Sequence, residues 1–201
     1  WQFDDVDELA RDHSVKIGAR NKIQIKRDNE PYDRVDVDAY ARFLVQRYPG
    51  QEVLDSINVI GQLDPADGVK IRFDGEAAPK DGLRVFNARV ETTGSEFWTG
   101  RLEYRFQKDD TRLLLTDLTL FPKARWTCNA YGRYELQNSQ MEEIGGYLQR
   151  NYDCIAGRLG VGFLPAYTRT DAVEVPEEWR IIFGLWLTAF PQGEVMSRHL
   201  R

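Results

Sequence analysis

The strongest constraint on the fold of this chain is a change in hydrophobic spacing after the turn-forming segment 64–68. In segment 69–74 hydrophobic and charged residues alternate strictly, whereas earlier hydrophobic residues recur near every 3.6 positions. Alternation with a period of 2 is typical of strands that bury one face of a sheet. Four further segments of this kind follow with short connections, at 83–93, 97–107, 111–121 and 124–137. Because parallel strands need long crossover segments, this spacing predicts an antiparallel meander.

Hydrophobic residues at helical spacing predict helices on both sides of this sheet. Segment 15–27 is the exception, since it alternates and predicts one strand or two strands joined at Gly18. In the last long helical segment, Gly145 and Gly146 would each cost about 1 kcal/mol relative to alanine, which indicates the close approach of another backbone. The expected helices cover segments 3–13, 38–48, 51–61, 139–160 and 176–190.

These elements predict an α+β fold with N-terminal helices, a five-to-six-stranded antiparallel curved sheet and two C-terminal helices. The length of 201 residues favours a single domain over 1–201, with 1–35 a candidate N-terminal extension and 175–201 a candidate docking segment. The element order resembles that of cystatin-like and NTF2-like folds, in which a curved sheet and its helices often enclose a pocket. This resemblance concerns element order alone and implies no function.

The composition is that of a folded, soluble protein, because 42% of the residues are hydrophobic and the mean hydropathy is −0.53. A net charge of −5 argues against nucleic-acid binding, which relies on lysines and arginines that neutralise phosphates. Segment 16–27 is nevertheless basic and holds no acidic residue. We expect it to be the solvated face of a strand. A weaker alternative is an anion-binding module formed by Lys16, Arg20, Lys22 and Lys26.

Segment 175–193 is the most apolar stretch of the chain. Pro176 and the two glutamates after it favour a helix start, although a buried strand is the competing interpretation. A helix of about 15 residues would be about 22 Å long, too short for a hydrocarbon core of about 30 Å, so no transmembrane span is predicted. The segment is expected either to fill its own sheet or to contact a protein partner or a membrane surface through 176–190. The candidate interface residues are Trp179, Phe183, Trp186 and Phe190.

The sequence offers no catalytic constellation. His13 and His199 are the only histidines and stand near opposite ends, which argues against a Ser-His-acid or Cys-His arrangement. Cys128 and Cys154 are the only cysteines, and two buried thiols are favoured over one bridge. No metal site and no cofactor are therefore predicted.

Asp117 is an unusual charge within a hydrophobic run, and the hairpin register decides its position. If Lys108 to Thr111 form a two-residue hairpin turn, Leu102 would oppose Asp117, whose carboxylate would point into the apolar side beside Tyr104 and could act as a general base. With one more residue in the turn, Leu102, Tyr104 and Phe106 would face Leu114, Thr116 and Leu118, and Asp117 would lie outside between Arg101 and Arg105. The second register is favoured because it buries fewer polar groups.

These observations favour a non-enzymatic protein-interaction domain, such as an accessory subunit of a larger assembly. The alternative is a small-ligand or enzymatic pocket lined by Asp117 and Tyr104. The first residue is Trp1 rather than Met, which is compatible with a processed exported or organellar protein, and the compartment stays open.

Overall fold

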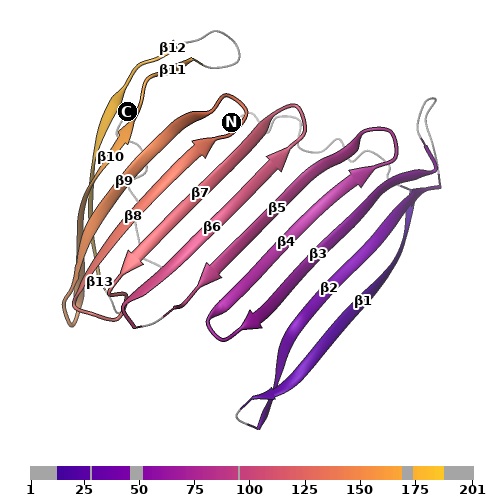
Figure 1. Ribbon diagram of the computed structural model, residues 1–201, viewed down its shortest axis with the longest axis horizontal. Coiled ribbons are helices and arrows are strands. Elements are labelled where there is room, and N and C mark those ends of the chain that lie inside the picture. Colours follow the sequence, from indigo (N-terminus) through magenta and orange to yellow (C-terminus); the bar gives the residue numbers. More distant parts are fainter. Residues whose placement is uncertain (1–12, 28, 46–51, 95, 169–173, 188–201) are drawn as a thin grey trace, which may run out of the picture.

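The computed structural model describes residues 13–27, 29–45, 52–94, 96–168 and 174–187. Within these residues the chain is all-β, with eleven strands joined antiparallel into one sheet in sequence order and a separate two-stranded ladder (Figure 1). The sheet contains β1 (Ser14–Arg27), β2 (Glu30–Leu44), β3 (Leu54–Ala66), β4 (Val69–Ala78), β5 (Gly82–Thr92), β6 (Trp98–Gln107), β7 (Thr111–Leu120), β8 (Trp126–Glu135), β9 (Gln140–Asn151), β10 (Ile155–Leu164) and β13 (Glu178–Leu187). The small ladder pairs β11 (Tyr167–Thr168) with β12 (Glu174–Val175).

The five strands predicted between residues 69 and 137 are confirmed as β4 to β8, and they pair as the expected antiparallel meander. Segment 15–27 forms a single strand, β1, which passes through Gly18 without a break. Short connections and period-2 alternation were therefore sufficient to place these strands.

The predicted α+β fold is wrong, because the described residues contain eleven antiparallel strands in one sheet and no helix. The described parts of 38–48, 51–61, 139–160 and 176–190 are the strands β2, β3, β9 with β10, and β13, and the expected helix at 3–13 lies outside the described residues. Small residues such as Ala39 and Ala41 interrupt the visible alternation, and Ile60 on the opposite face imitates helical spacing. The part of the chain that the structure describes also holds no helix with the length and apolarity needed to cross a membrane.

The sheet has no conventional hydrophobic core. Among the described residues, the buried hydrophobic side chains are only Ala78, Leu113 and Ala156, and no large side chain is fully enclosed. More polar residues than hydrophobic ones are buried, namely Ser56, Asp64, Glu103, Thr127, Asn129 and Glu135. A folded protein in water usually buries more hydrophobic than polar side chains. The candidate functional site is therefore expected on the two faces of the sheet.

Candidate functional site: an apolar face and a charged face

One face of the sheet, here called the apolar face, is hydrophobic from edge to edge. A single cross-strand row illustrates this, because only Thr116 and Gly132 in it are not large hydrophobic residues. The row reads Ile23, Val35, Leu63, Ile71, Val90, Leu102, Thr116, Gly132, Ile144, Phe163 and Trp179, one residue from each of the eleven strands. The alternation of strands therefore gathers the hydrophobic residues of the whole chain on one surface.

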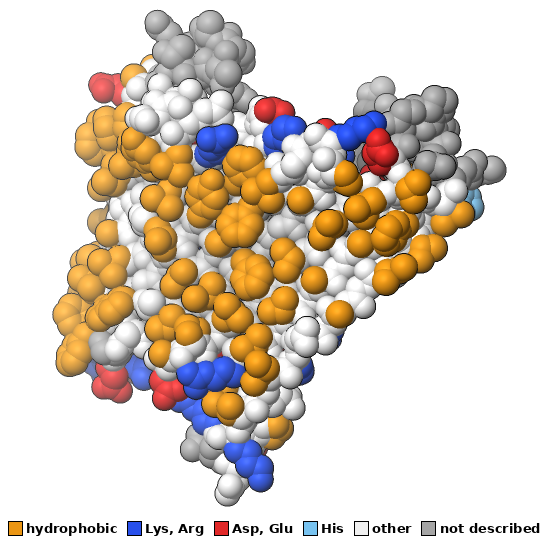
Figure 2. Space-filling model, turned by 45° about the vertical axis from the view of Figure 1, so that its right-hand side comes forward, with side chains coloured by type: hydrophobic (Ala, Val, Ile, Leu, Met, Phe, Trp, Pro, Cys, Tyr) orange, Lys and Arg blue, Asp and Glu red, His pale blue; other side chains and the backbone are white. Residues whose placement is uncertain are grey.

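The apolar face is uncovered in the described part of the chain. Twenty-nine large hydrophobic side chains are exposed, most of them on this face, and Ile181 reaches 81%. Figure 2 shows hydrophobic side chains spread across the face, with lysine, arginine and acidic side chains at its upper and lower borders. Taking about 70 Å² for each half-exposed side chain, the patch is about 1,500 Å², several times what a protein in water tolerates. Leaving it in water would cost about 40 kcal/mol, more than the whole stability of a typical domain.

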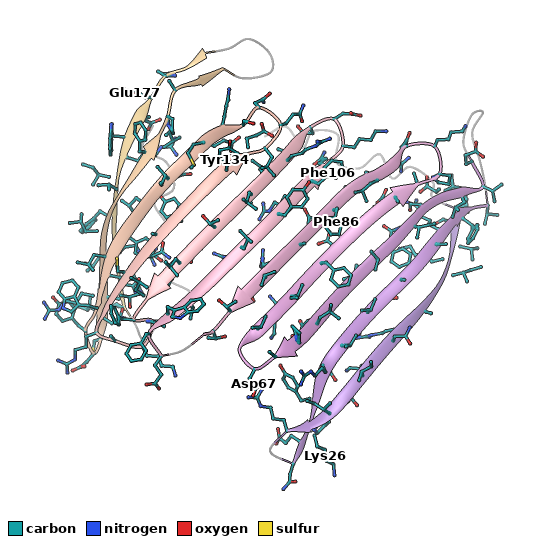
Figure 3. The ribbon with its side chains drawn as sticks, in the orientation of Figure 1. Lys26, Asp67, Phe86, Phe106, Tyr134 and Glu177 are labelled. Atoms are coloured by element: carbon teal, nitrogen blue, oxygen red, sulfur yellow. The ribbon has the colours of Figure 1, made fainter. Side chains whose placement is uncertain are left out.

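Aromatic residues collect at both ends of the strands on this face. The ends of β7 and β9 and the starts of β6 and β8 form the first rim, which holds Trp98, Trp126, Arg150 and Tyr152. The opposite strand ends form the second rim, with Phe86, Phe106, Arg112 and Tyr134. Figure 3 shows Phe106 and Tyr134 near one end of their strands.

Both rims contain an arginine that contacts aromatic rings. At the first rim, Arg150 lies 4.9 Å from the centroid of Trp126 and 4.7 Å from that of Tyr152. At the second rim, Arg112 lies 5.4 Å from the centroid of Phe106. Such cation–π contacts place a charge beside rings that have one apolar and one hydrated side. The sequence held a signal for these residues, because each is a cation at a position whose alternation calls for a hydrophobic residue.

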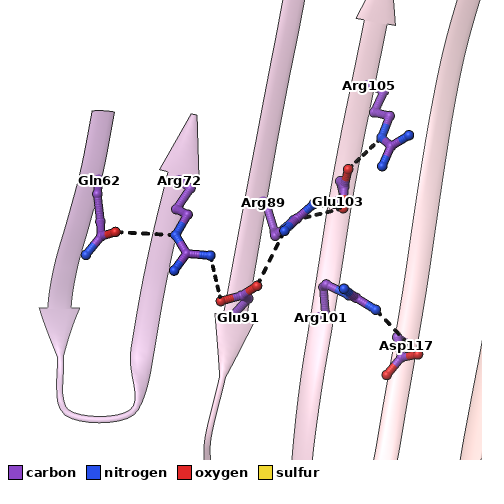
Figure 4. Close-up of polar contacts among 8 residues, drawn as sticks. All are labelled: Gln62, Arg72, Arg89, Glu91, Arg101, Glu103, Arg105 and Asp117. Atoms are coloured by element: carbon purple, nitrogen blue, oxygen red, sulfur yellow. Dashed lines mark hydrogen bonds and ion pairs between the residues drawn. The ribbon is translucent and has the colours of Figure 1, made fainter. Parts of the chain in front are cut away.

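The opposite face, here called the charged face, carries paired cations and carboxylates (Figure 4). At its centre, Arg89 donates to Glu103 Oε2 at 2.8 Å and Arg105 donates to Glu103 Oε1 at 2.5 Å. Arg72 lies 3.4 Å from Glu91, which continues the network across β4 and β5. One row of this face reads Lys22, Asp36, Gln62, Arg72, Arg89, Glu103, Leu115, Arg133 and Glu143.

Glu103 is a buried carboxylate with two charged donors. Burial by itself raises its pKa, but the hydrogen bonds from Arg89 and Arg105 outweigh that effect and hold the pKa below the ordinary glutamate value. Because Glu103 is 7% exposed, its charge depends on these two partners. Glu103, Arg89 and Arg105 therefore form one hydrogen-bonded group that helps to hold β5 and β6 together, unlike isolated charges on the surface.

The charged face is hollowed between β1 and β6, where side chains surround a space of about 880 Å³. The hollow contains cations and carboxylates in similar numbers, so its charge selects neither anions nor cations. Its charged lining comprises Arg20, Asp33, Asp36, Asp38, Arg72, Asp74, Arg89, Glu103 and Arg105. Water and small polar solutes fit such a surface better than apolar ligands do.

Asp117 and Tyr104 lie on opposite faces of the sheet, so the structure does not bring them together. Arg101 pairs with Asp117 across β6 and β7, with their charged groups 3.8 Å apart, while Tyr104 pairs with Leu114. The connection from Gln107 to Thr111 holds three residues, with Asp109 at a φ of 61°, and this extra residue sets the favoured register. The predicted outward position of Asp117 is confirmed, although Phe106 pairs with Arg112 and Leu118 pairs with Gly100, outside the predicted set.

The candidate interface residues of 176–190 divide between the two faces. Trp179 and Phe183 lie on the apolar face of β13 and are 68% and 67% exposed. Trp186 lies on the charged face, where its ring is 5.1 Å from the Arg158 guanidinium. Phe190 lies outside the described residues.

Most cations of the basic segment 16–27 lie on the charged face of β1, and acidic residues of β2 lie opposite several of them. Arg20 pairs with Asp36 at 2.6 Å and Lys22 pairs with Asp33 at 2.6 Å. Lys16 lies over the Tyr40 ring at 5.0 Å, and Lys26 pairs along the backbone with Pro31. Acidic neighbours thus offset the charge of the segment, a feature that the local sequence did not reveal.

Cys128 and Cys154 are free and exposed, so the expectation of buried thiols is wrong. Cys128 stands on the apolar face between Leu120 and Leu148, where a small hydrophobic side chain fits the alternation. Among the described residues, no group of three or more histidine, cysteine or acidic side chains is arranged to hold a metal ion.

The chain matches no known protein-family model, and no curated protein is detectably similar to it in sequence.

Proposed function

We propose that the sheet lies across a lipid bilayer, with acyl chains covering the apolar face and water bordering the charged face. The observation that carries this proposal is the hydrophobic row through all eleven strands, which leaves about 1,500 Å² uncovered. Acyl chains are the partner that would cover such a broad and featureless surface, because they need no matching shape or hydrogen bonds. The protein would then act as a membrane component without a catalytic step.

The strand lengths support this location. Strands β4, β6, β7, β8, β10 and β13 each hold 10 residues. Ten residues in a strand extend about 33 Å, and a tilt of about 45° reduces the span across the bilayer to about 23 Å. That value matches the apolar band of about 25 Å found on lipid-facing sheets.

The rims support it as well. Tryptophan and tyrosine favour the boundary between acyl chains and headgroups, where the ring is in apolar surroundings and its polar atom is hydrated. The first rim supplies Trp98, Trp126 and Tyr152, and the second supplies Tyr134. The pairs of Glu103 with Arg89 and Arg105 lie on the other face, where water would stabilise them.

Neighbouring residues on β7 provide a direct test, because Leu118 lies on the apolar face and Thr119 on the charged face. In a background with Cys128→Ser and Cys154→Ser, each residue is replaced by cysteine and labelled with an environment-sensitive fluorophore. The full chain is then reconstituted in phosphatidylcholine vesicles. We expect a nitroxide on the acyl chains to quench the label at 118, and iodide in water to quench the label at 119.

Equal quenching of both labels by iodide, or no quenching of the label at 118 by the acyl-chain nitroxide, would contradict the membrane location. A second pair on β13, Ile181 and Ile182, provides an independent repeat at the edge of the sheet. Agreement between the two pairs would extend the result from one hairpin to the whole face.

A protein partner that covers the edge strand β13 is the second candidate function. It is favoured by one observation, the 68%, 81% and 67% exposure of Trp179, Ile181 and Phe183. In that case labels on β13 would be protected by the partner, whereas the label at 118 would stay accessible to iodide. A variant with Trp179→Ala and Phe183→Ala would lose the association while the sheet remained folded.

A further inference from the structure

We infer that Arg150, together with the rings of Trp126 and Tyr152, binds the phosphate of an anionic lipid headgroup at the first rim. This inference rests on the proposed membrane location and names the lipid chemistry that the rim selects.

The geometry at this position is held by the backbone. Tyr152 N donates to Ile155 O at 2.7 Å, which closes the connection between β9 and β10. Asn151 N donates to Arg125 O at 2.8 Å, which joins the end of β9 to the start of β8 beside Trp126. The guanidinium of Arg150 lies over both rings, which come from neighbouring chain segments joined by these backbone hydrogen bonds.

Arg150 differs from most arginines of the sheet in its partners. Many of them pair with carboxylates on the charged face or near it, as do Arg20, Arg42, Arg72, Arg84, Arg89, Arg101, Arg105, Arg133 and Arg180. Among the described residues, the Arg150 guanidinium has no carboxylate partner, and it lies over the two rings instead. Ring stacking occupies the faces of a guanidinium and leaves its N–H groups in the plane able to donate to an anion.

The position of Arg150 on β9 explains why a phosphate is the expected anion. It follows Ile144, Gly146 and Leu148 on the apolar face, so its stem continues the lipid-facing surface. The next pair on the apolar face, Cys128 and Leu148, lies closer to the centre of the strands than Arg150 does. On the other side of Arg150, β9 ends at Asn151. A cation near this boundary costs about 0–1 kcal/mol, compared with about 2–4 kcal/mol at the bilayer centre. Phosphates are the anions that a bilayer presents at this depth.

A second exposed cation lies beside the site. Arg125 is exposed, and its carbonyl accepts the hydrogen bond from Asn151, the residue that follows Arg150. Two cations at neighbouring strand ends favour a headgroup with a net negative charge over a zwitterionic headgroup, in which an ammonium offsets the phosphate. At the second rim, Arg112 contacts a single ring, so the two-ring arrangement is particular to Arg150 among the two rim arginines.

The test uses the full chain in micelles that contain equal amounts of phosphatidylglycerol and phosphatidylcholine, with bound lipids counted by native mass spectrometry. We expect a preference for phosphatidylglycerol in the unmodified chain and a decrease of about fivefold in Arg150→Gln, the effect of losing roughly 1 kcal/mol. Arg150→Lys should keep part of the preference, because it retains the charge and loses the planar donors. Excess inorganic phosphate should leave the preference in place.

The matched control is Arg158→Gln. Arg158 is also stacked between two rings, 4.1 Å from the Tyr147 centroid and 5.1 Å from that of Trp186, but it lies on the charged face. This variant should keep the full preference. An unchanged preference in Arg150→Gln would overturn the lipid site, and removal of the preference by inorganic phosphate would show binding of the anion alone. If the label at Leu118 is still quenched by acyl chains in either case, the membrane location stands and only the lipid site fails. If that quenching is absent, both fail.

Discussion

Tyr131 lies across Gly145, its partner on the neighbouring strand, and its hydroxyl donates a hydrogen bond to Glu143 Oε1 at 3.1 Å. A Cβ on Gly145 would stand 2.6 Å from the Tyr131 hydroxyl oxygen and 2.7 Å from Val161 O. One strand further, a Cβ on Gly162 would stand 3.1 Å from the same hydroxyl. The ring therefore covers the charged face of β9 and β10, where glycines leave space for it.

Gly145→Ala should destabilise the sheet by about 1–3 kcal/mol, because the new methyl group meets a carbonyl oxygen as well as the tyrosine. Gly157→Ala is the matched control, since the nearest atom to its Cβ is Leu185 Cδ1 at 3.8 Å. Thermal unfolding of both variants in one detergent should give a lower unfolding temperature for Gly145→Ala than for Gly157→Ala. Equal unfolding temperatures would show that Tyr131 and β10 shift freely to accept the methyl group.

Burial, followed by the negative charge of Glu143, raises the pKa of Tyr131 to about 12. In the unfolded chain the phenol titrates near its ordinary value of about 10. Between these values the unfolded state loses the proton first, so the free energy of unfolding should fall as the pH rises from about 10 to about 12. Tyr131→Phe should remove this decrease between about pH 10 and about pH 12, while the pH dependence of the free energy of unfolding below about pH 10 stays the same. Unfolding temperatures measured across this range, in both proteins, give the comparison.

Glu103→Gln should destabilise the folded chain at neutral pH by about 1–3 kcal/mol, a range reduced from that of fully buried pairs because Arg105 is half exposed. The pKa of Glu103 is lower in the folded state than in the unfolded state, so its contribution is complete above the unfolded value and declines as the pH falls below it. The difference between the two proteins should therefore shrink in acid. Glu96→Gln, at an 81% exposed carboxylate 3.6 Å from Lys123, should have little effect at any pH.

Leu118→Arg should impair folding into vesicles by about 1–3 kcal/mol, because it places a charge on the apolar face between the midplane and the first rim, two residues from the end of β7. Thr119→Arg, one residue along the strand, adds the same charge to the face that borders water and should be tolerated. The fraction folded, measured against urea in the presence of vesicles, distinguishes the two. A similar loss in both variants would count against an acyl-chain environment on one face only.

The two native cysteines should differ in reactivity once the chain is in vesicles. Cys128 lies on the apolar face, so acyl chains should protect it from a water-soluble maleimide. Cys154 stands in the connection between β9 and β10 at the first rim and should react. Mass spectrometry should detect one adduct before unfolding in urea and two afterwards. Two adducts in intact vesicles would place Cys128 in water.

The strands that could be predicted from the sequence are those in which large hydrophobic residues mark every second position. In β4, Val69, Ile71 and Phe73 do so without interruption, and the connections around it are too short for anything except a hairpin. Where one face carries small residues, the same alternation is present but hidden. In β2 the apolar face includes Ala39 and Ala41, and alanine is also the residue that most favours helices.

For segment 178–187 the sequence predicted a helix instead of the strand β13 for a different reason. Ile182 and Trp186 lie on the charged face of β13, so hydrophobic residues occupy both faces and the period disappears. The competing interpretation of this segment as a buried strand was correct in the strand and wrong in the burial, because Trp179, Ile181 and Phe183 are exposed. A length argument based on the helical rise of about 1.5 Å per residue does not apply to a strand, which advances about 3.3 Å per residue.

The functional surface could not be predicted from single residues, because it is a property of eleven strands in register. The register of β6 and β7 was predictable, since one turn residue determined whether Asp117 would be buried. The partners of Glu103 were not, because Arg89 is 14 positions away and joins it only through the pairing of β5 with β6.

The number of strands in the described sheet has a consequence for its edges. Neighbouring strands run in opposite directions throughout, and eleven is odd, so β1 and β13 point the same way. A ladder formed directly between these two edges would be parallel, unlike every other ladder in the sheet. Antiparallel pairing to both edges requires one intervening strand, or any odd number, running opposite to them. In lipid the unpaired N–H and C=O groups of an edge have no water to bind, so the proposed location requires that both edges of the described sheet be paired or covered.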